Sequence, residues 1–461
     1  MKKLVSLLLL LACSLLSAAT ALAATPQPPG TAYQQRYFTT IAAASCLGVY
    51  LPQSSTEFDY LRSYGWQIVP QVEKSAKVEA NFAIAHNYFK DIGKDVYLVT
   101  FRGSASKGDW KINLKTERVN FGGSTLEEMS QLAKQPLIEG GPAVHAGFNS
   151  YVDVILRSSV VDGKGNLQGV FAKVQQNPNT HLVLTGHSLG GAVATLLGER
   201  LVSLGLPADR FTIVTFGAPA VGNAAFVEKY GEAVDLLRIT NTADPVPGSL
   251  QTFFGGYKQF GRQEKYSLSP KVSSMQHAMA MYFDYSVSEF YKERDHQISL
   301  GRLQPAPRAR TASGKPVVAL WLNTSKSLSK LAYVTDIKRF VTDEYRRLLP
   351  SYVVMGRNLP KDDYTTNDII KLSREAGAEY VLVCGIDGSQ PQQEAYWYLT
   401  LEQALFDKNG RMLTMGSFGR KVAPAVGNIQ AAGENFWQAR DDIFAQLPFI
   451  NMQHVPTMGQ L

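Results

Sequence analysis

The amino-acid sequence predicts an α/β protein, with a mostly parallel sheet in a first domain and a smaller α/β domain after it. The chain of 461 residues exceeds one ordinary domain. In its first two thirds, strand-like runs alternate with helix-like runs, which is typical of a parallel sheet covered on both faces. The alternation stops at 301–316 and begins again at residue 317, which indicates a second folding unit.

The elements expected in the first domain follow from its apolar runs. Buried strands are expected where apolar and β-branched residues follow one another, at 96–101, 181–185, 211–216 and 236–240. Helices are expected between them, including 147–157 and 190–204. The stretch 301–316 carries proline, glycine and basic residues without periodicity, and this composition predicts an exposed linker. We therefore expect a first domain at 30–300 and a second at 317–461.

The second domain repeats the pattern on a smaller scale. Strands are expected at 317–322, 352–354, 380–383 and 396–406, with a turn at 407–410 into a further strand. Helices are expected at 337–349, 367–376 and 436–447. We recognise no metal cluster, phosphate loop or paired carboxylates in this part of the sequence. Two roles stay open: docking to an envelope protein partner, or support of folding and stability.

The amino terminus predicts a secretory signal peptide at 1–23. Lys2 and Lys3 precede an apolar run at 4–16, and a cleavage site of small residues follows, with the cut expected after Ala23. The run is too short for a permanent membrane span. We therefore expect export to the periplasm or the medium. Cys13 closes a stretch similar to a bacterial lipobox, so a lipoprotein anchored through Cys13 is the alternative.

Charge and cysteine content exclude some classes of protein. The net charge of +7, spread over this length, is a mild basic balance that favours anionic surfaces weakly and does not indicate nucleic-acid binding. Apart from Cys13, only Cys46 and Cys384 are present, each in apolar surroundings. Two buried thiols are expected, and no disulfide framework.

The candidate nucleophile is Ser188, at the apex of an expected strand–turn–helix. The apolar run 182–185 leads into Gly186, His187 and Ser188, and Leu189 and Gly190 open a helix of small residues. A serine on so sharp a turn requires small neighbours two residues away, which Gly186 and Gly190 provide. The turn aims the hydroxyl at the amino end of a helix, where negative charge is stabilised. His187 is expected to pack beneath the turn.

A nucleophilic serine needs a base and an acid that orients the base. At turns of this kind the chain order is serine, acid, histidine. Asp244 is the candidate acid, because it lies just past the carboxyl end of an expected strand, where sites form in parallel sheets. His277, at the start of a helix-like run, is the candidate base, with His296 in reserve. His454 lies in the tail of the other domain.

The oxyanion that forms during attack needs two N–H donors. One is expected from Leu189, the residue after the nucleophile, and one from an earlier loop. The stretch 100–106 leaves a buried strand and contains Gly103, which lets the backbone turn. Ser104 is therefore the second candidate donor.

These motifs together resemble the class 3 lipases, the group similar to fungal lipases, over roughly residues 35 to 300. The stretches that carry the resemblance occur in the family's order: 101–104, Trp110, 144–148, 186–191, 216–219, 221–222, 244–247 and His277. The chain is thus similar to an exported bacterial member with an extra C-terminal domain. That domain resembles, in strand and helix order alone, the small α/β domains of bacterial periplasmic assembly proteins.

The resemblance implies an α/β-hydrolase fold and hydrolysis of acylglycerols or related esters. It implies Ser188, Asp244 and His277 as the triad and Ser104 and Leu189 as the oxyanion hole. It also implies a lid after Ser104, with the apolar side chains Trp110, Ile112 and Leu114. No metal or organic cofactor is implied. The partners are a lipid or ester substrate and a transient contact with a membrane or lipid surface.

The chain departs from the family pattern at four places. The lid region 107–114 is polar for a lid that lies on oil droplets. Asn113 stands where an aspartate commonly steadies the oxyanion serine, and Gln259 stands where a histidine is often found. The segment 124–141 is an apparent insertion. These changes bear on long-chain triglyceride as substrate and on interfacial activation.

The sequence therefore predicts a serine ester hydrolase, a lipase or carboxylesterase that works through an acyl-enzyme. Two alternatives stay open at this point. One is an enzyme with another substrate or acceptor, a phospholipase or an acyltransferase. The other is a non-catalytic envelope scaffold that uses the hydrolase fold for binding.

Overall fold

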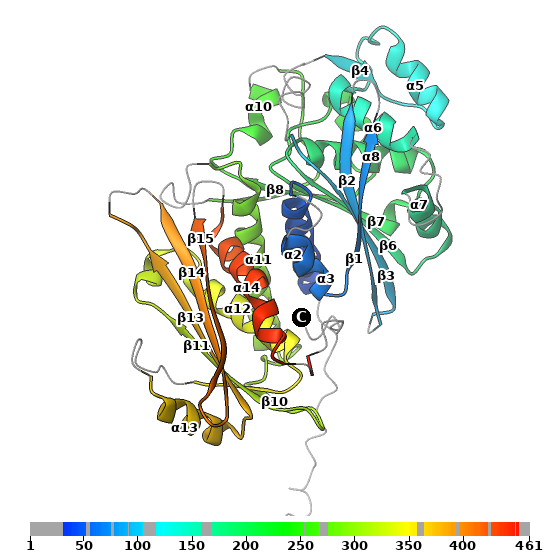
Figure 1. Cartoon of the computed structure of the whole chain (residues 1–461). Coiled ribbons are helices and arrows are strands. Elements are labelled where there is room, and N and C mark those ends of the chain that lie inside the picture. Colours follow the sequence, from blue (N-terminus) through cyan, green and yellow to red (C-terminus); the bar gives the residue numbers. More distant parts are fainter. Residues whose placement is uncertain are drawn as a thin grey trace, which may run out of the picture.

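The computed structural model describes the chain from residue 31 to residue 450, with gaps. The described ranges are 31–51, 56–74, 78–90, 92–104, 117–157, 167–252, 255–267, 275–356, 364–392, 396–422, 426–447 and 449–450. The predicted signal peptide, with Cys13, lies outside these ranges. Two mixed sheets dominate the described part, with helices between them (Figure 1).

The first sheet contains seven strands among the described residues, in the order β1-β2-β3-β6-β7-β8-β9. The strands β3, β6, β7, β8 and β9 run parallel, whereas β1 and β2 are antiparallel additions at one edge. Their bounds are β1 Gln67–Lys74, β2 Glu79–Phe89, β3 Lys94–Phe101, β6 Thr180–His187, β7 Phe211–Phe216, β8 Leu236–Asn241 and β9 Arg262–Tyr266. A mostly parallel sheet is what the sequence predicted.

Helices cover both faces of this sheet. One face carries α6 (Ala146–Arg157), α7 (Leu167–Gln176) and α8 (Leu189–Ser203). The other carries α2 (Thr31–Gly48) and α11 (Met279–Ser299). The remaining elements of this region are α3 Thr56–Ser63, β4 Arg118–Asn120, α5 Leu126–Lys134, β5 Ala143–His145, the short helix Ala208–Arg210, α9 Ala224–Tyr230 and α10 Val246–Thr252.

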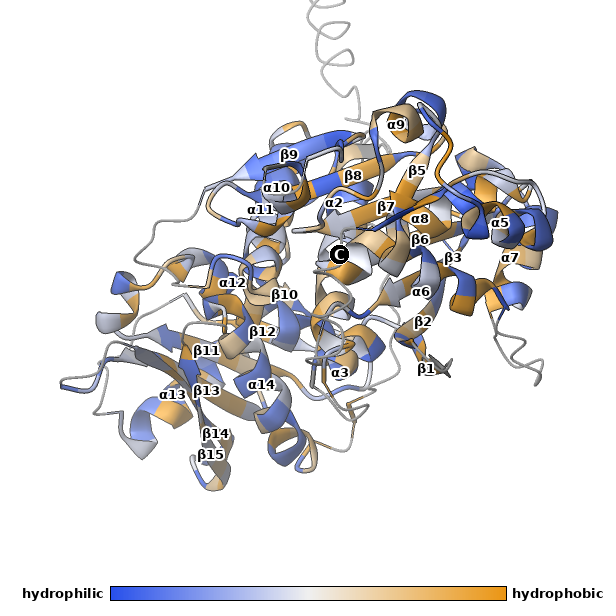
Figure 2. Cartoon of the chain, turned by 90° about the horizontal axis from the view of Figure 1, so that it is seen from above, coloured by the Kyte–Doolittle hydropathy of each residue, from blue (hydrophilic) through white to orange (hydrophobic). Residues whose placement is uncertain are grey.

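Alternate residues of the central strands enter two different cores. Leu182 and Leu184 of β6 join the core beneath α6 and α8, which we call the α8 core. Val183, between them, joins a core with α2 and α11. Burial on both faces explains why these strands are continuous apolar runs rather than alternating ones. Figure 2 shows β7 and α8 as largely hydrophobic.

The second sheet has six strands within the described ranges, in the order β10-β12-β11-β13-β14-β15. The strands β12, β11 and β13 are parallel, and the remaining pairings are antiparallel. Its elements are β10 Ala309–Arg310, β11 Val318–Thr324, the short helix Ser327–Lys330, α12 Val334–Leu348, β12 Tyr352–Val354, α13 Thr366–Ala376, β13 Tyr380–Ser389, β14 Trp397–Asp407, β15 Met412–Val422 and α14 Asn428–Phe444.

The two sheets share one core. The cluster that contains Val183 of β6 and Phe283 of α11 continues through Phe340 of α12 to Trp437 of α14. The ring of Tyr60 on α3 lies 4.9 Å from that of Trp437, centroid to centroid. We call this cluster the shared core. Figure 1 shows α2, α11, α12 and α14 between the two sheets.

The segment 301–316, predicted as an exposed linker, contains a strand of the second sheet. Ala309 and Arg310 form β10, which pairs antiparallel with β12. The Arg310 guanidinium donates from Nη2 to the Arg346 carbonyl at 2.8 Å and from Nε to the Pro350 carbonyl at 3.1 Å. This part of the segment is therefore fixed to the second sheet, although most of 301–316 is exposed. The linker and the domain bounds stay a prediction.

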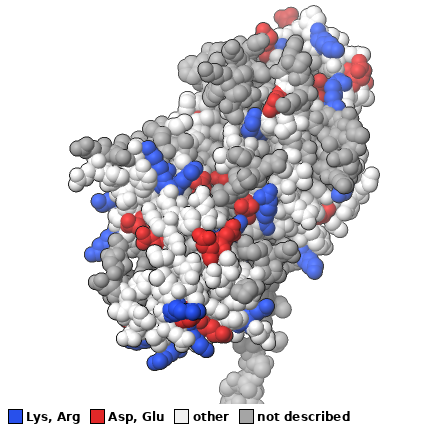
Figure 3. All heavy atoms as spheres, viewed as in Figure 1, with Lys and Arg blue, Asp and Glu red and all other residues white. Residues whose placement is uncertain are grey.

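Two further sequence expectations concern the thiols and the surface. Cys46 and Cys384 are both free and buried. Acidic and basic side chains are interspersed on the face of the molecule seen in Figure 3. Among the described helices, none has the length and apolar character needed to cross a membrane.

Candidate active site

Ser188 lies on the sharp turn between β6 and α8. Its backbone has a φ of 58°, and Tyr333 is the only other described non-glycine residue with a positive φ. A Cβ on Gly186 would lie 2.2 Å from the Gly190 carbonyl carbon, and a Cβ on Gly190 would lie 2.0 Å from the Phe101 oxygen. Both glycines are therefore required by close backbone contact. Strain of this kind is characteristic of a nucleophile held on a strand-to-helix turn.

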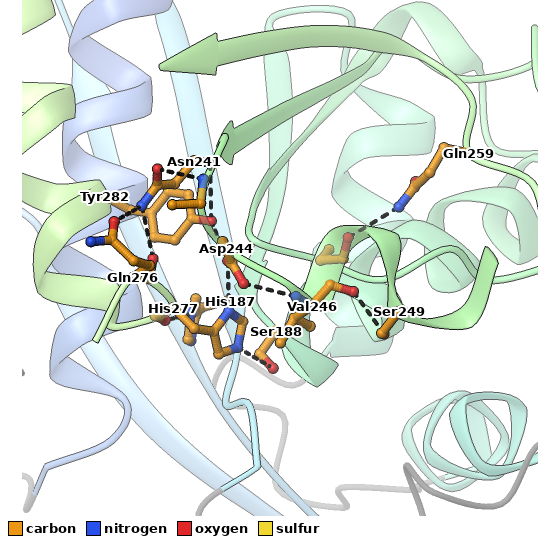
Figure 4. A network of polar contacts seen from close by, with 12 residues as sticks. His187, Ser188, Asn241, Asp244, Val246, Ser249, Gln259, Gln276, His277 and Tyr282 are labelled. Carbon is orange, nitrogen blue, oxygen red and sulfur yellow. Dashed lines mark hydrogen bonds and ion pairs between the residues drawn. The ribbon is translucent and has the colours of Figure 1, made fainter. Parts of the chain in front are cut away.

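The structure brings Ser188, His277 and Asp244 together, although they lie far apart in the sequence (Figure 4). His277 Nε2 lies 2.9 Å from Ser188 Oγ, and His277 Nδ1 lies 2.7 Å from Asp244 Oδ2. With its Nδ1 proton donated to the carboxylate, the imidazole presents an unprotonated Nε2 to the serine hydroxyl. These distances are the ones that a serine nucleophile, its base and an orienting acid require.

The three side chains come from three elements at one edge of the first sheet. Ser188 opens α8, Asp244 follows β8, and His277 precedes α11. The Asp244 side chain is fully buried, whereas that of His277 is 22% exposed. The acid is thus shielded while the base stays accessible to a substrate.

Asp244 accepts hydrogen bonds from two groups besides His277. The Val246 N–H donates to Oδ1 at 2.9 Å, and the Tyr282 hydroxyl donates to Oδ2 at 2.5 Å. Burial, together with the Asp244 carboxylate, raises the pKa of Tyr282 well above its ordinary value, so the hydroxyl stays a donor. These donors fix the carboxylate that orients the imidazole.

His187 packs beneath the turn, as the sequence reasoning expected. Its Nε2 donates to the His277 carbonyl at 2.8 Å, and its Nδ1 lies 2.9 Å from the Tyr50 hydroxyl. Burial, with His277 nearby, lowers the pKa of His187 well below its ordinary value. The neutral ring lies with its centroid 4.5 Å from that of His277 and supports the base from below.

The predicted oxyanion donors lie beside the nucleophile. Leu189 is the first residue of α8, and the first N–H groups of a helix have no acceptor within it. Gly103, next to Ser104, sits so close to the turn that a Cβ there would lie 2.6 Å from the His187 oxygen. The loop after β3 and the amino end of α8 therefore converge at Ser188.

Some of the predicted features lie elsewhere. The predicted lid residues Trp110, Ile112 and Leu114, together with Asn113 and the tail residue His454, lie outside the described residues. The reserve base His296 is exposed near the carboxyl end of α11. It is not among the residues that the structure brings together at Ser188.

The remaining departures from the family pattern have structural counterparts. Gln259 Nε2 donates to the Ala218 and Pro247 carbonyls at 3.2 and 2.9 Å, and so ties α10 to the loop after β7. The apparent insertion 124–141 contains α5, which begins after the capping residue Thr125. Asn120 Nδ2 donates to the Pro136 carbonyl at 2.9 Å and fixes the return of that segment.

Two polar residues at the site escaped the sequence reasoning. Tyr282 contacts Asp244 from the first turns of α11. Asn241 Nδ2 donates to Gln276 Oε1 at 2.6 Å and to the Gln276 carbonyl at 3.1 Å, which holds the residue before His277 against the end of β8. The short spacing between His277 and Tyr282 is the sequence signal that could have indicated Tyr282.

The mostly parallel sheet and the geometry at Ser188 are those expected of one class of protein, the serine hydrolases with an α/β-hydrolase fold. Within the described ranges, no group of three or more His, Cys, Asp or Glu side chains could hold a metal ion. Residues 98–253, about a third of the chain, match the family model of lipase (class 3).

The chain is similar to curated lipases and phospholipases over part of its length. It is 31% identical over 167 residues to secreted mono- and diacylglycerol lipase 1 of Fusarium solani, covering 36% of this chain and 42% of the relative. It is 31% identical over 168 residues to phospholipase A1 EG1 of Oryza sativa subsp. indica, covering 34% and 36%. The chain thus spans less than half the length of these relatives. Among solved structures, it resembles the Rhizomucor miehei triacylglyceride lipase, with 22% identity, coverage of 51% and 80%, and a TM-score of 0.39.

Proposed function

We propose that this chain is a serine hydrolase that cleaves carboxylic esters of acylglycerols or related lipids. One observation carries the proposal: on a strained turn, Ser188 Oγ lies 2.9 Å from an imidazole whose other nitrogen lies 2.7 Å from a buried carboxylate. The match of residues 98–253 to class 3 lipases supports lipid esters as the substrate class.

The reaction begins with attack by Ser188. His277 Nε2 accepts the serine proton as Oγ attacks the ester carbonyl carbon, and Asp244 stabilises the imidazolium that forms. His277 then gives the proton to the leaving alcohol, and an acyl-enzyme remains. Water, deprotonated by the same imidazole, attacks the acyl-enzyme and releases the fatty acid. These steps use only groups of the chain and water.

The tetrahedral intermediate carries a negative oxygen that the N–H groups of Ser104 and Leu189 stabilise. The Leu189 N–H belongs to the first turn of α8 and is held there before the reaction, so little reorganisation of this donor is needed when charge develops. Loss of one such donor typically costs about 100- to 1,000-fold in rate.

Replacement of the nucleophile tests the proposal. We expect Ser188→Ala to lower kcat on a short-chain p-nitrophenyl ester by at least about 10⁴-fold, because no other group takes the acyl chain. The fold should remain, as judged by circular dichroism. Ser203→Ala is the matched control, since Ser203 is on the same helix and donates only to the Glu199 carbonyl. Turnover retained in Ser188→Ala would contradict the assignment.

The two alternatives have their own discriminating measurements. Relatives named as phospholipase A1 or galactolipase favour a polar lipid as substrate, and a headgroup series with fixed acyl chains distinguishes it from an acylglycerol. Transfer of the acyl group to an added alcohol reveals an acyltransferase. A non-catalytic scaffold would leave Ser188 unlabelled by a fluorophosphonate probe, whereas a triad at work gives a covalent adduct on that residue.

We propose that the protein is exported, to the periplasm or the medium. The basic start, apolar run and small-residue site of residues 1–23 support this, as does similarity to secreted lipases. The mass of the mature amino terminus is the test. Cleavage after Ala23 gives a chain that begins at Ala24, whereas a lipoprotein begins at a lipid-modified Cys13. An uncleaved Met1 would contradict export by this route.

A further inference from the structure

A polar cavity of about 400 Å³ lies beside the triad acid, between β8, β9 and α10. Asp244 forms one part of its wall. The rest is lined mainly by Arg238, Thr240, Gln251, Gln259, Gln263 and Lys265. This lining of amides, hydroxyls and two cations does not suit an acyl chain, so the cavity is a candidate site for a polar group.

The alternation of β8 determines which of its side chains reach the cavity. Leu237 and Ile239 enter the shared core on the side of α2 and α11. Successive side chains of a strand point to opposite faces, so Arg238 and Thr240 project from the other face. Both line the cavity. The orientation of Arg238 thus follows from the same pattern that buries its neighbours.

The edge strand β9 extends the same face. Glu264 points toward α2, where its carboxylate accepts from Arg36 Nη1 at 2.6 Å. Gln263 and Lys265, on either side of it, therefore project beside the β8 side chains. Figure 2 shows β9 as a hydrophilic strand. The parallel register pairs Arg238 with Gln263 and Thr240 with Lys265.

Arg238 is a buried cation without a carboxylate partner among the described residues. The residue is 8% exposed, and its Nε donates to the Phe260 carbonyl at 2.6 Å. Within the described ranges, its two Nη groups form no hydrogen bond or ion pair. Burial lowers the pKa of Arg238. A buried guanidinium is costly unless an anion or several acceptors compensate it.

The charges and hydrogen bonds of the other groups that face the cavity favour the binding of one anion. The exposed Lys265 has no ion-pair partner in the described part of the chain. The Gln263 amide already donates to Thr240 Oγ1 at 2.9 Å. Asp244 is the one described acidic residue of the wall, but its side chain is fully buried, and His277, Tyr282 and the Val246 N–H occupy its oxygens. Two cations therefore line the cavity with no available carboxylate among the described residues.

We propose that this cavity binds a phosphate group between Arg238 and Lys265. The two residues are diagonal neighbours on adjacent strands, with side chains long enough to meet over roughly 7–8 Å. The tetrahedral oxygens of a phosphate can reach both cations, whereas the two oxygens of a carboxylate lie on one side of one carbon. Guanidinium groups also match phosphate in geometry. The source is a phospholipid headgroup or free phosphate.

Binding is tested apart from catalysis, in the Ser188→Ala background. Inorganic phosphate is titrated at low ionic strength and followed by calorimetry. We expect saturable binding that weakens at least tenfold on Lys265→Gln and on Arg238→Gln. Arg262→Gln is the matched control, because Arg262 lies on the same strand but pairs with Asp235 at 2.8 Å. The Lys265 variant changes an exposed residue, so it keeps the test valid if the Arg238 variant does not fold.

Three results would overturn the site: no saturable binding, equal binding by all variants, or acetate bound as tightly as phosphate. Two results support it and identify the source. If Lys265→Gln in the otherwise native enzyme lowers kcat/KM on phosphatidylglycerol but not on diacylglycerol with the same acyl chains, a headgroup occupies the cavity. If both rates stay unchanged while phosphate binding is lost, free phosphate does. Because binding needs no turnover, failure of the proposed hydrolysis would not be mistaken for failure of this site.

Discussion

The two faces of α11 fasten the helix to different parts of the molecule. On one face, Tyr282 donates to Asp244, the acid of the proposed triad. On the opposite face, Asp284 accepts hydrogen bonds from the Ile429 and Gln430 N–H groups at the amino end of α14, at 3.2 and 3.1 Å. Residues two apart point about 200° from one another on a helix, so the two contacts are independent.

The two faces differ in the group that each aspartate contacts, which is His277 for Asp244 and the amino end of α14 for Asp284. Asp244 is held by three donors and in turn orients a base, whereas Asp284 caps a helix of the second sheet. Gly427 admits that carboxylate, because a Cβ there would lie 2.5 Å from Asp284 Oδ1. The helix that follows His277 is thus anchored to the C-terminal region. This region belongs to the core that positions the base.

The largest expected effect is on the pH dependence of the free energy of unfolding, and it comes from Asp284. Burial raises the pKa of Asp284 from 3.8 to about 7, against the opposing effect of the α14 N–H groups. The folded chain therefore binds more protons than the unfolded chain between these two values. The free energy of unfolding falls as pH rises through this window and levels off above it, by about 4 kcal/mol from this group.

Asp284→Asn removes this titration. We expect the free energy of unfolding of the variant, measured by urea denaturation at pH 4.5, 6 and 8, to depend less on pH than that of the wild type. Part of the dependence remains, because Glu434 of α14 also has a raised pKa, to about 8, through burial beside Glu57. Tyr282→Phe is the control and should keep the wild-type dependence. A variant with the wild-type slope would show that Asp284 does not titrate in this window.

Charged and titratable neighbours of Asp284 influence how far its pKa is raised. Asp336 at the start of α12 adds a repulsive charge that favours protonation of Asp284. Tyr266 and Tyr333, whose pKa values burial raises, stay neutral near it. Removal of the Asp336 charge is therefore expected to lower the pKa of Asp284 in the folded chain, which narrows the window from its upper end without abolishing it.

The sequence was informative where one stretch of chain determines its own structure. The run expected as a strand at 211–216 is β7, and the helix expected at 190–204 is α8 at Leu189–Ser203. Both segments consist mainly of apolar and small residues, so their burial could be expected from composition. The turn at Ser188 could be predicted in part for a similar reason, because Gly186 is required by backbone contact with Gly190, four residues further on. The contact that requires Gly190 is with the distant Phe101.

Contacts between distant segments could not be predicted. Asp284 reads as one polar residue in an amphipathic helix, and its partners lie 145 and 146 residues away. The stretch around Arg310 has the composition of a linker. Its two-residue strand forms only because it pairs with a strand from another part of the chain, β12. The sequence also does not indicate locally that the two sheets share a core. The apolar residues of α14 could equally have packed only on the second sheet.

A smaller effect, on kcat, is expected from the replacement of Tyr282 on the other face of α11. Tyr282→Phe removes a donor from the Asp244 carboxylate but leaves His277 and the Val246 N–H in place. A hydrogen bond to a charged group contributes about 1.5–3 kcal/mol, so kcat should fall about 10- to 100-fold with little change in KM. A purely structural role would lower stability without this selective loss of kcat. Asp284→Asn, on the other face of α11, should keep the kcat of the wild type.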